Sequence, residues 1–103
     1  MNTVSKPLID IMKLNQERYG TTFDFDEALD KLKEELQEFI DASETQDEHG
    51  QVDALCSIIT TTAKNITLLR YNPELALKQH VRFIIDNTNK PDFRVCKLKN
   101  TNT

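Results

Sequence analysis

The stretch Lys33-Glu34-Glu35-Leu36-Gln37-Glu38-Phe39-Ile40-Asp41 decides the fold of this chain. Its carboxylates recur at spacings of three and four residues, and so do the apolar side chains of Leu32, Leu36, Phe39 and Ile40. This spacing is typical of an amphipathic α-helix with an acidic stripe beside an apolar one. The acidic stripe fits one half of a metal site. It also fits a solvated helix face, and the rest of the chain has to distinguish the two interpretations.

The composition indicates one all-α domain. The chain has 103 residues, of which 38% are hydrophobic and 29% are charged, and it contains only two Gly and three Pro. That length fits a single domain, small enough that oligomerisation helps it to bury apolar surface. The low Gly and Pro content argues against a disordered or loop-rich chain. We expect a compact bundle of about four helices that oligomerises through helix faces, with residues 92–103 as a flexible or extended tail.

The sequence gives no sign of a membrane segment or a secretory signal. No apolar run approaches the roughly 20 residues that span a bilayer, and no basic segment followed by an apolar one opens the chain. Cys56 and Cys96 are far apart and lack metal-ligand spacing, so we expect reduced thiols, with Cys56 in the core. These features predict a cytoplasmic protein without membrane partners.

Acidic and basic residues are segregated along the chain. Residues 24–53 hold twelve of the seventeen acidic residues and only two lysines, whereas residues 54–103 hold eight Lys or Arg and three acids. This pattern argues against a nucleic-acid groove, which needs a dominant basic patch. It suits a site where carboxylates hold cations while basic groups meet an anion, and it fits charge complementarity between subunits equally well.

Apolar periodicity and capping residues predict four helices, over residues 7–19, 26–42, 51–69 and 73–86. Asp24 with Glu27 resembles a capping box, and Asn72 is the expected N-cap of the last helix, with Pro73 at its first position. The polar residues 43–50 are expected to connect two antiparallel helices, with the alternative that the end of this stretch already belongs to the next helix. Residues 93–96 are expected to form a short extended segment.

The same periodicity predicts which side chains face inward. In the three longer apolar patterns these are Ala28, Leu29, Leu32, Leu36, Phe39 and Ile40, then Val52, Leu55, Cys56, Ile59, Ala63 and Ile66, then Leu75, Leu77, Val81, Ile84 and Ile85.

Two of these helices carry oxygen ligands at helical spacing. Glu35 and Glu38 are three residues apart, and Asp53 and Ser57 are four apart on the helix expected to face them. Magnesium takes carboxylate, water and phosphate oxygens in octahedral geometry, and facing helices of a bundle can supply such ligands. Lys64 continues the same face, where it is placed either to meet a phosphate or to neutralise the acidic helix.

At these residues the chain resembles the MazG-like all-α nucleoside triphosphate pyrophosphohydrolases, a superfamily that includes phosphoribosyl-ATP pyrophosphohydrolase and dimeric dUTPases. The resemblance rests on Glu34-Glu35-Leu36-Gln37-Glu38, on Val52-Asp53-Ala54-Leu55-Cys56-Ser57, and on Asp86-Asn87-Thr88-Asn89-Lys90. It covers about residues 25–90. It implies a magnesium-dependent cleavage of a nucleotide between its α- and β-phosphates, with manganese as a possible substitute, in a homodimer or homotetramer.

The resemblance also implies roles for individual residues. Glu35, Glu38 and Asp53 would hold magnesium, with Ser57 as a neutral ligand, and Glu34 would be a further ligand or the base that positions the attacking water. Asn87 and Lys90 would contact the phosphates or sugar of the substrate. Lys64 is a further candidate for substrate binding, from its place on the Asp53 and Ser57 face and not from the resemblance.

The second motif departs from the family pattern, because Ala54 and Ser57 stand where a glutamate and an aspartate are typical. A serine brings no negative charge to a metal site. Two other functions therefore remain open: a catalytically silent protein that binds nucleotide or a protein partner, and a plain helical interaction protein.

Overall fold

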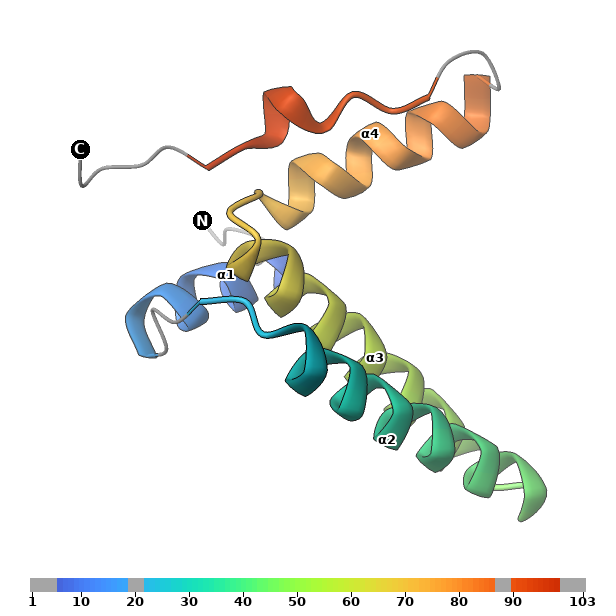
Figure 1. Cartoon of the computed structure of the whole chain (residues 1–103). Helices are drawn as coiled ribbons and strands as arrows, with labels where there is room; N and C mark the ends of the chain where they lie inside the picture. Colours follow the sequence, from blue (N-terminus) through green and yellow to red (C-terminus); the bar gives the residue numbers. More distant parts are fainter. Residues whose placement is uncertain (1–5, 19–21, 87–89, 99–103) are drawn as a thin grey trace, which may run out of the picture.

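The computed structural model describes residues 6–18, 22–86 and 90–98, and these are helical almost throughout (Figure 1). The elements in chain order are α1 (Pro7–Arg18), α2 (Phe25–Glu44), α3 (Glu48–Leu68), α4 (Pro73–Asp86) and the short 3-10 helix η1 (Phe93–Cys96). Within these ranges there is no strand, only an isolated antiparallel bridge between Tyr71 and Lys97. The predicted all-α class with four helices is confirmed. Asn87 and the predicted helix end at Tyr19 lie outside the described residues.

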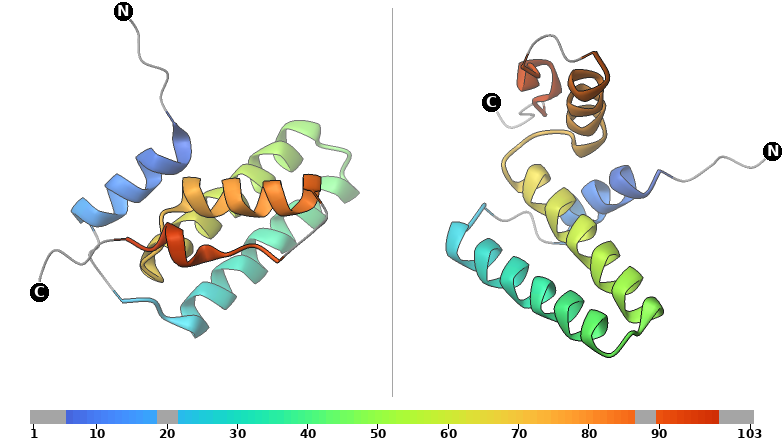
Figure 2. Two further views of the ribbon diagram at one scale, coloured as in Figure 1. Left: turned by 90° about the horizontal axis from the view of Figure 1, so that it is seen from above. Right: turned by 90° about the vertical axis from the view of Figure 1, so that its right-hand side faces the viewer.

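The two longest helices, α2 and α3, form an antiparallel hairpin (Figures 1 and 2). Asp24 caps α2 by accepting a hydrogen bond from the Glu27 backbone N–H at 3.1 Å, as predicted. The connection spans residues 45–47, so it is shorter than the predicted 43–50, and the end of that stretch is helical, which was the stated alternative. Asp47 caps α3 by accepting from the Gly50 N–H at 3.0 Å, so the helix starts at Glu48 rather than near Gln51.

Gly50 is required by this tight start of α3. A Cβ atom at position 50 would overlap the Asp47 carboxylate and come within 3.1 Å of the Ala42 Cβ. The glycine therefore lets the capping carboxylate of α3 and the end of α2 approach the same point. Gln46, in the connection, has a φ of 57°, which is the left-handed conformation that closes the turn.

The small chain buries little apolar surface of its own. In the described residues the buried apolar side chains are Ala54, Ala63, Ala76, Cys96 and Pro73. Several side chains that we expected to face inward are exposed, and for the isolated chain that prediction was wrong; they are Leu29, Leu36, Ile40, Val52, Leu55, Ile59, Leu75, Leu77, Val81, Ile84 and Ile85. Cys56 is also exposed, and Cys96 is the buried thiol.

Helices α1 and α4 pack against one end of α3, and η1 packs on α4. Helix α1 contacts α3 and α4, and α4 also contacts α3 and η1 (Figure 2). Among the described elements, α2 packs against α3 alone. Ala63 and Thr67, in the C-terminal half of α3, are buried there. The hairpin therefore projects from a small cluster of α1, α4 and η1. No helix in the described parts of the chain is long and apolar enough to cross a membrane.

The C-terminal segment folds back onto the turn before α4. The Asn72 N–H donates to the Cys96 carbonyl at 2.8 Å, and the Leu98 N–H donates to the Arg70 carbonyl at 2.8 Å. We expected residues 93–96 to be extended, but they form η1, because Asp92 caps the turn by accepting from the Arg94 N–H at 3.1 Å. The hydrogen bonds from the Arg94 side chain and backbone lower the pKa of Asp92 to about 2, and burial raises the pKa of the Cys96 thiol.

Replacing Asn72 with Ala is expected to lower the free energy of unfolding by about 1–2 kcal/mol. The Asn72 Oδ1 accepts from two backbone N–H groups at the start of α4, those of Glu74 at 2.9 Å and Leu75 at 3.2 Å, and alanine would leave both without this partner. Urea unfolding measures the loss. Asn72→Ser keeps a capping oxygen and should retain most of the stability; equal losses in both variants would contradict a capping role.

Candidate functional site

Glu35 is the only carboxylate that is buried among the described residues, with 3% of its surface exposed. Its Oε2 atom accepts a hydrogen bond from Thr61 Oγ1 at 2.7 Å, which ties α2 to α3 across 26 residues of sequence. Its Oε1 atom is also buried and has no hydrogen-bond partner among the residues that the structure describes. Buried polar atoms are nearly always paired in folded proteins, so this carboxylate oxygen calls for a partner, such as water or an ion, that the described side chains do not supply.

The position of Glu35 follows from the helix period. Leu32 and Phe39 lie three residues before it and four after it, so all three share the α2 face that packs on α3. On α3, the opposing face presents small or hydroxyl side chains, namely Ala54, which is 4% exposed, the half-buried Ser57, and Thr61. A carboxylate in this interface loses solvation and gains one hydrogen bond, which makes it a poor stabilising element.

The remaining predicted acids lie on one side of the hairpin. Each residue of an α-helix is rotated by about 100° around the helix axis from the residue before it. On α2, the side chains of Glu34 and Glu38 are therefore rotated by about 60–100° from that of Glu35. On α3, those of Asp53 and Ser57 are rotated by about 40–80° from that of Thr61, in the same sense. In an antiparallel pair, equal senses place both sets on the same side of the hairpin. We call this the acidic side. Glu34, Glu38 and Asp53 are exposed there.

These acids do not gather at a single point. Asp53 lies eight residues from Thr61 towards the connection, or about 12 Å along the helix, whereas Glu38 lies three residues, or about 4.5 Å, from Glu35 in that direction. No group of three His, Cys, Asp or Glu side chains in the described ranges is placed to share a metal ion. Glu34 forms an exposed ion pair with Lys31 at 3.7 Å, which contributes little to stability.

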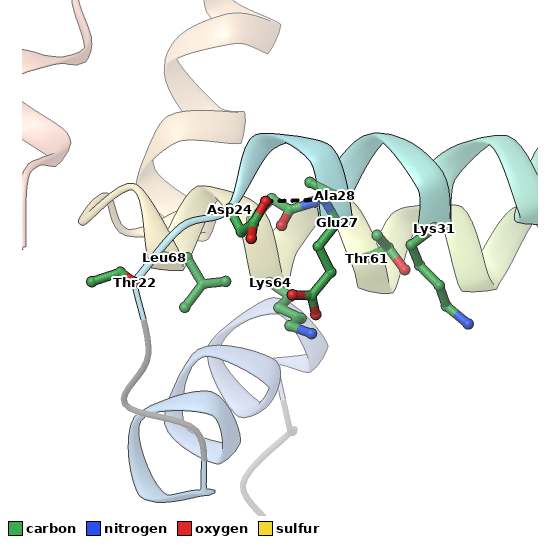
Figure 3. A pocket seen from close by; sticks show the side chains of 9 residues that line it. Thr22, Asp24, Glu27, Ala28, Lys31, Thr61, Lys64 and Leu68 are labelled. Carbon is green, nitrogen blue, oxygen red and sulfur yellow. Dashed lines mark hydrogen bonds between the residues drawn. The ribbon is translucent and has the colours of Figure 1, made fainter.

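The acidic side is hollowed next to Glu35 by a pocket of about 450 Å³ between the start of α2 and the end of α3 (Figure 3). Thr61 lines the pocket and also holds Glu35, so the two features are adjacent. The lining residues are Thr22, Asp24, Glu27, Ala28, Lys31, Thr61, Lys64, Asn65 and Leu68. The side chains of Glu27 and Lys64 extend into the same part of it, and Lys64 is half-buried.

The pocket contains residues that the sequence alone did not single out. Thr61 and Asn65 line the pocket, and neither belongs to the site that was predicted from the sequence. The usable signal was the spacing of Ser57, Thr61, Lys64 and Leu68, which repeats every three or four residues along one face of α3. Thr22 and Asp24 belong to the entry of α2, where no periodicity points to a pocket.

Of the two late residues of the predicted site, the structure describes Lys90 and not Asn87. Lys90 is exposed and follows α4, which makes no contact with α2. Asn87 is outside the described residues. The contribution of Asn87 and Lys90 to substrate binding therefore remains a prediction from the resemblance.

The donor set nevertheless fits magnesium in its chemistry. Every candidate ligand is an oxygen, and no side chain in the described ranges donates to the buried Glu35 Oε1. Comparisons with family models, with curated proteins and with solved structures found no match for this chain. The site therefore has to be interpreted from its own residues.

Proposed function

We propose that this protein is a magnesium-dependent nucleoside triphosphate pyrophosphohydrolase, cleaving between the α- and β-phosphates as the MazG-like resemblance implies. The observation that carries the proposal is the buried Glu35 carboxylate, with one oxygen held by Thr61 and the other without a partner. An acid in this position costs stability, so a function is needed to account for it.

Glu35 and Glu38 would hold the metal, with Ser57 as a neutral oxygen beside them and Asp53 one turn nearer the connection. Magnesium at such a site supplies charge neutralisation for the phosphates of the substrate. Glu34 faces solvent next to these residues, where a carboxylate can hold a water molecule and accept its proton. Its ion pair with Lys31 is too exposed to prevent this.

The pocket next to Glu35 would receive the substrate. Lys64 and Lys31 provide positive charge at its edge, while Asn65 and Thr22 provide both hydrogen-bond donors and acceptors. Ala28 and Leu68 add an apolar surface. Seven of the nine lining residues are polar or charged, the carboxylates of Asp24 and Glu27 among them, so the pocket suits a polar ligand better than an apolar one.

A second candidate is a protein that binds a nucleotide without turning it over. The observation that favours it is on α3, where the buried Ala54 and the half-buried Ser57 occupy the two positions at which the resemblance calls for acids. With the acids of α2 alone, a bound ion would have fewer negative ligands than a MazG-like site supplies. Such a protein would retain nucleotide binding with weak magnesium affinity.

Glu38→Gln is expected to abolish magnesium-dependent release of pyrophosphate, because it removes a charged ligand and leaves the helix intact. The measurement is pyrophosphate release over a panel of nucleoside triphosphates with magnesium or manganese. Glu44→Gln is the matched control, since Glu44 is an exposed glutamate in the last turn of the same helix and outside the site.

Turnover by Glu38→Gln equal to that of the native protein would refute the assignment. If the native protein releases no pyrophosphate but binds magnesium or a non-hydrolysable triphosphate saturably, the second candidate holds. If it binds neither, the acidic side is only a solvated surface of an interaction protein.

A further inference from the structure

The α2 side of the pocket has its charges divided along its length. Lys31, Glu27 and Asp24 all line the pocket. Each residue advances about 1.5 Å along a helix axis, so Lys31 lies about 6 Å from Glu35 towards the start of α2. Glu27 and Asp24 lie about 12 Å and 16 Å from Glu35 in the same direction. The lysine of α2 is therefore nearer to the acids proposed to hold magnesium, and the two pocket carboxylates are farther away.

The order of groups in a nucleotide matches this division. The phosphates carry the negative charge, the sugar follows them, and the base lies at the far end. Phosphates held through magnesium at Glu35 and Glu38 would lie next to Lys31. The carboxylates of Glu27 and Asp24 would repel phosphate at the other end of the pocket. The base of a bound nucleotide would therefore lie towards the start of α2.

Glu27 is the carboxylate that is directed into this part of the pocket. Its side chain extends into the pocket beside that of Lys64 (Figure 3). Asp24 instead uses one carboxylate oxygen to cap α2, by accepting from the Glu27 N–H at 3.1 Å. Ala28 and Leu68 add apolar surface to the lining, which the flat ring of a base can contact.

We infer that Glu27 accepts a hydrogen bond from the amino group of the base, so that the pocket selects cytosine or adenine over uracil or hypoxanthine. A carboxylate accepts hydrogen bonds and does not donate them, and acidic side chains accept from the N4 amino group of cytosine in protein–DNA complexes. Uracil and hypoxanthine carry a carbonyl oxygen in place of that amino group, and two acceptors repel each other. This inference rests on the proposed function, because it requires the pocket to receive a nucleotide.

The ring N–H of uracil is a poorer partner for Glu27 than an amino group is. That N–H lies between two carbonyl oxygens, so a carboxylate that approaches it also approaches two other acceptors. An amino group projects beyond the ring, where a carboxylate meets its N–H bonds first. The preference is therefore expected to follow the amino group itself, in pyrimidines and in purines.

Glu27→Gln is the test variant, and Asp26→Asn is its matched control. Both acids are exposed and lie in the first turn of α2. Of the two, Glu27 alone lines the pocket beside Glu35. Each substitution removes one negative charge from the same turn and replaces a carboxylate with an amide of nearly the same size. The two variants therefore differ in their access to the pocket and not in their chemistry.

Calorimetric titration in magnesium with the α,β-methylene analogues of CTP, UTP, ATP, ITP and 2′-deoxy-CTP measures binding without turnover. The native protein should bind the CTP and ATP analogues at least about tenfold more tightly than the UTP and ITP analogues. Glu27→Gln should reduce both ratios below about threefold, because an amide can also donate to the carbonyl. Asp26→Asn should leave both ratios unchanged.

Equal binding of the amino and carbonyl analogues by the native protein would overturn the inference and leave the proposed function standing. A Glu27→Gln protein that loses the same factor of affinity for every analogue would also overturn it, because Glu27 would then act only through its charge. A Glu27-dependent preference for CTP over 2′-deoxy-CTP, without a preference between bases, would place Glu27 at the sugar instead. Binding of none of the analogues would refute the proposed function, and the inference with it.

Discussion

Replacing Glu35 with Met and Thr61 with Val together is expected to stabilise the protein by about 1–3 kcal/mol while removing magnesium binding. The double substitution takes a desolvated carboxylate with one unpaired oxygen out of the helix interface. It also removes the Thr61 hydroxyl, which would otherwise lose the Glu35 oxygen that accepts its hydrogen bond. Methionine is unbranched and adapts to the space between Leu32 and Phe39, so little cavity cost is expected.

The single variants separate the contributions. Glu35→Met alone should already be stabilising, because a threonine in α3 can turn its hydroxyl to the carbonyl four residues earlier. Thr67 does so with the Ala63 carbonyl at 2.9 Å. Glu34→Met is the matched control one residue away, and it should change stability little because Glu34 is exposed.

The measurements are urea unfolding without magnesium and magnesium titration by calorimetry. The opposite result, a loss of several kcal/mol in the double variant, would show that the Glu35 and Thr61 pair holds the hairpin together. In that case the buried carboxylate would need no functional explanation. A stabilised variant that still binds magnesium would place the metal elsewhere on the acidic side.

Local signals in the sequence predicted much of the helical framework. The bounds of α4 were predicted correctly, because Asn72 and Pro73 together define a helix start. The start of α3 was missed by three residues because polar residues after Asp47 were interpreted as loop, although Asp47 itself is a good N-cap. Capping depends on side chains within a few residues, which is why it can be recognised from sequence.

What covers each apolar face could not be predicted. Periodicity placed Leu36 and Ile40 on an apolar helix face. The same pattern occurs whether that face is covered by a helix of the same chain or by a second subunit. Cys56 shows the same limit, since it lies in an apolar run and is exposed, while Cys96 in a polar tail is buried by the return of η1 onto the turn before α4.

The candidate site shows where sequence reasoning stops. The acidic residues of α2 were identified from their spacing, yet spacing did not distinguish Glu35 from its neighbours. The distinguishing feature is the place of Glu35 between Leu32 and Phe39 on the packed face, which leaves it 3% exposed while Glu34 and Glu38 are exposed. The separation of Asp53 from Glu38 depends on how α2 and α3 are aligned along their axes, a tertiary property.

Ser57→Asp is expected to raise magnesium affinity by about 10–100-fold and to produce or increase pyrophosphate release. Ser57 is half-buried, on the α3 face that Thr61 shares, one turn nearer the connection than the contact with Glu35. An added carboxylate attracts a unit positive charge at 4 Å by about 4 kcal/mol at an effective dielectric constant of 20. Partial solvation and reorganisation reduce this gain, and each factor of ten in affinity requires only about 1.4 kcal/mol.

Without magnesium, the added negative charge is expected to lower the free energy of unfolding. The dependence of stability on magnesium is therefore the most direct test of the substitution. Near neutral pH the new aspartate repels Glu38 and Glu35, so Ser57→Asp should be less stable than the native protein in EDTA. Magnesium should reverse the difference, because a ligand stabilises the state that binds it in proportion to the logarithm of its concentration over its dissociation constant. Thr60→Asp is the control, because Thr60 is an exposed hydroxyl residue on the same helix, and it should show neither effect.

If the stability of the Ser57→Asp protein does not depend on magnesium, the hairpin does not bring these oxygens to one ion. An active variant beside a silent native protein would instead establish a binding protein that has lost its catalytic acid.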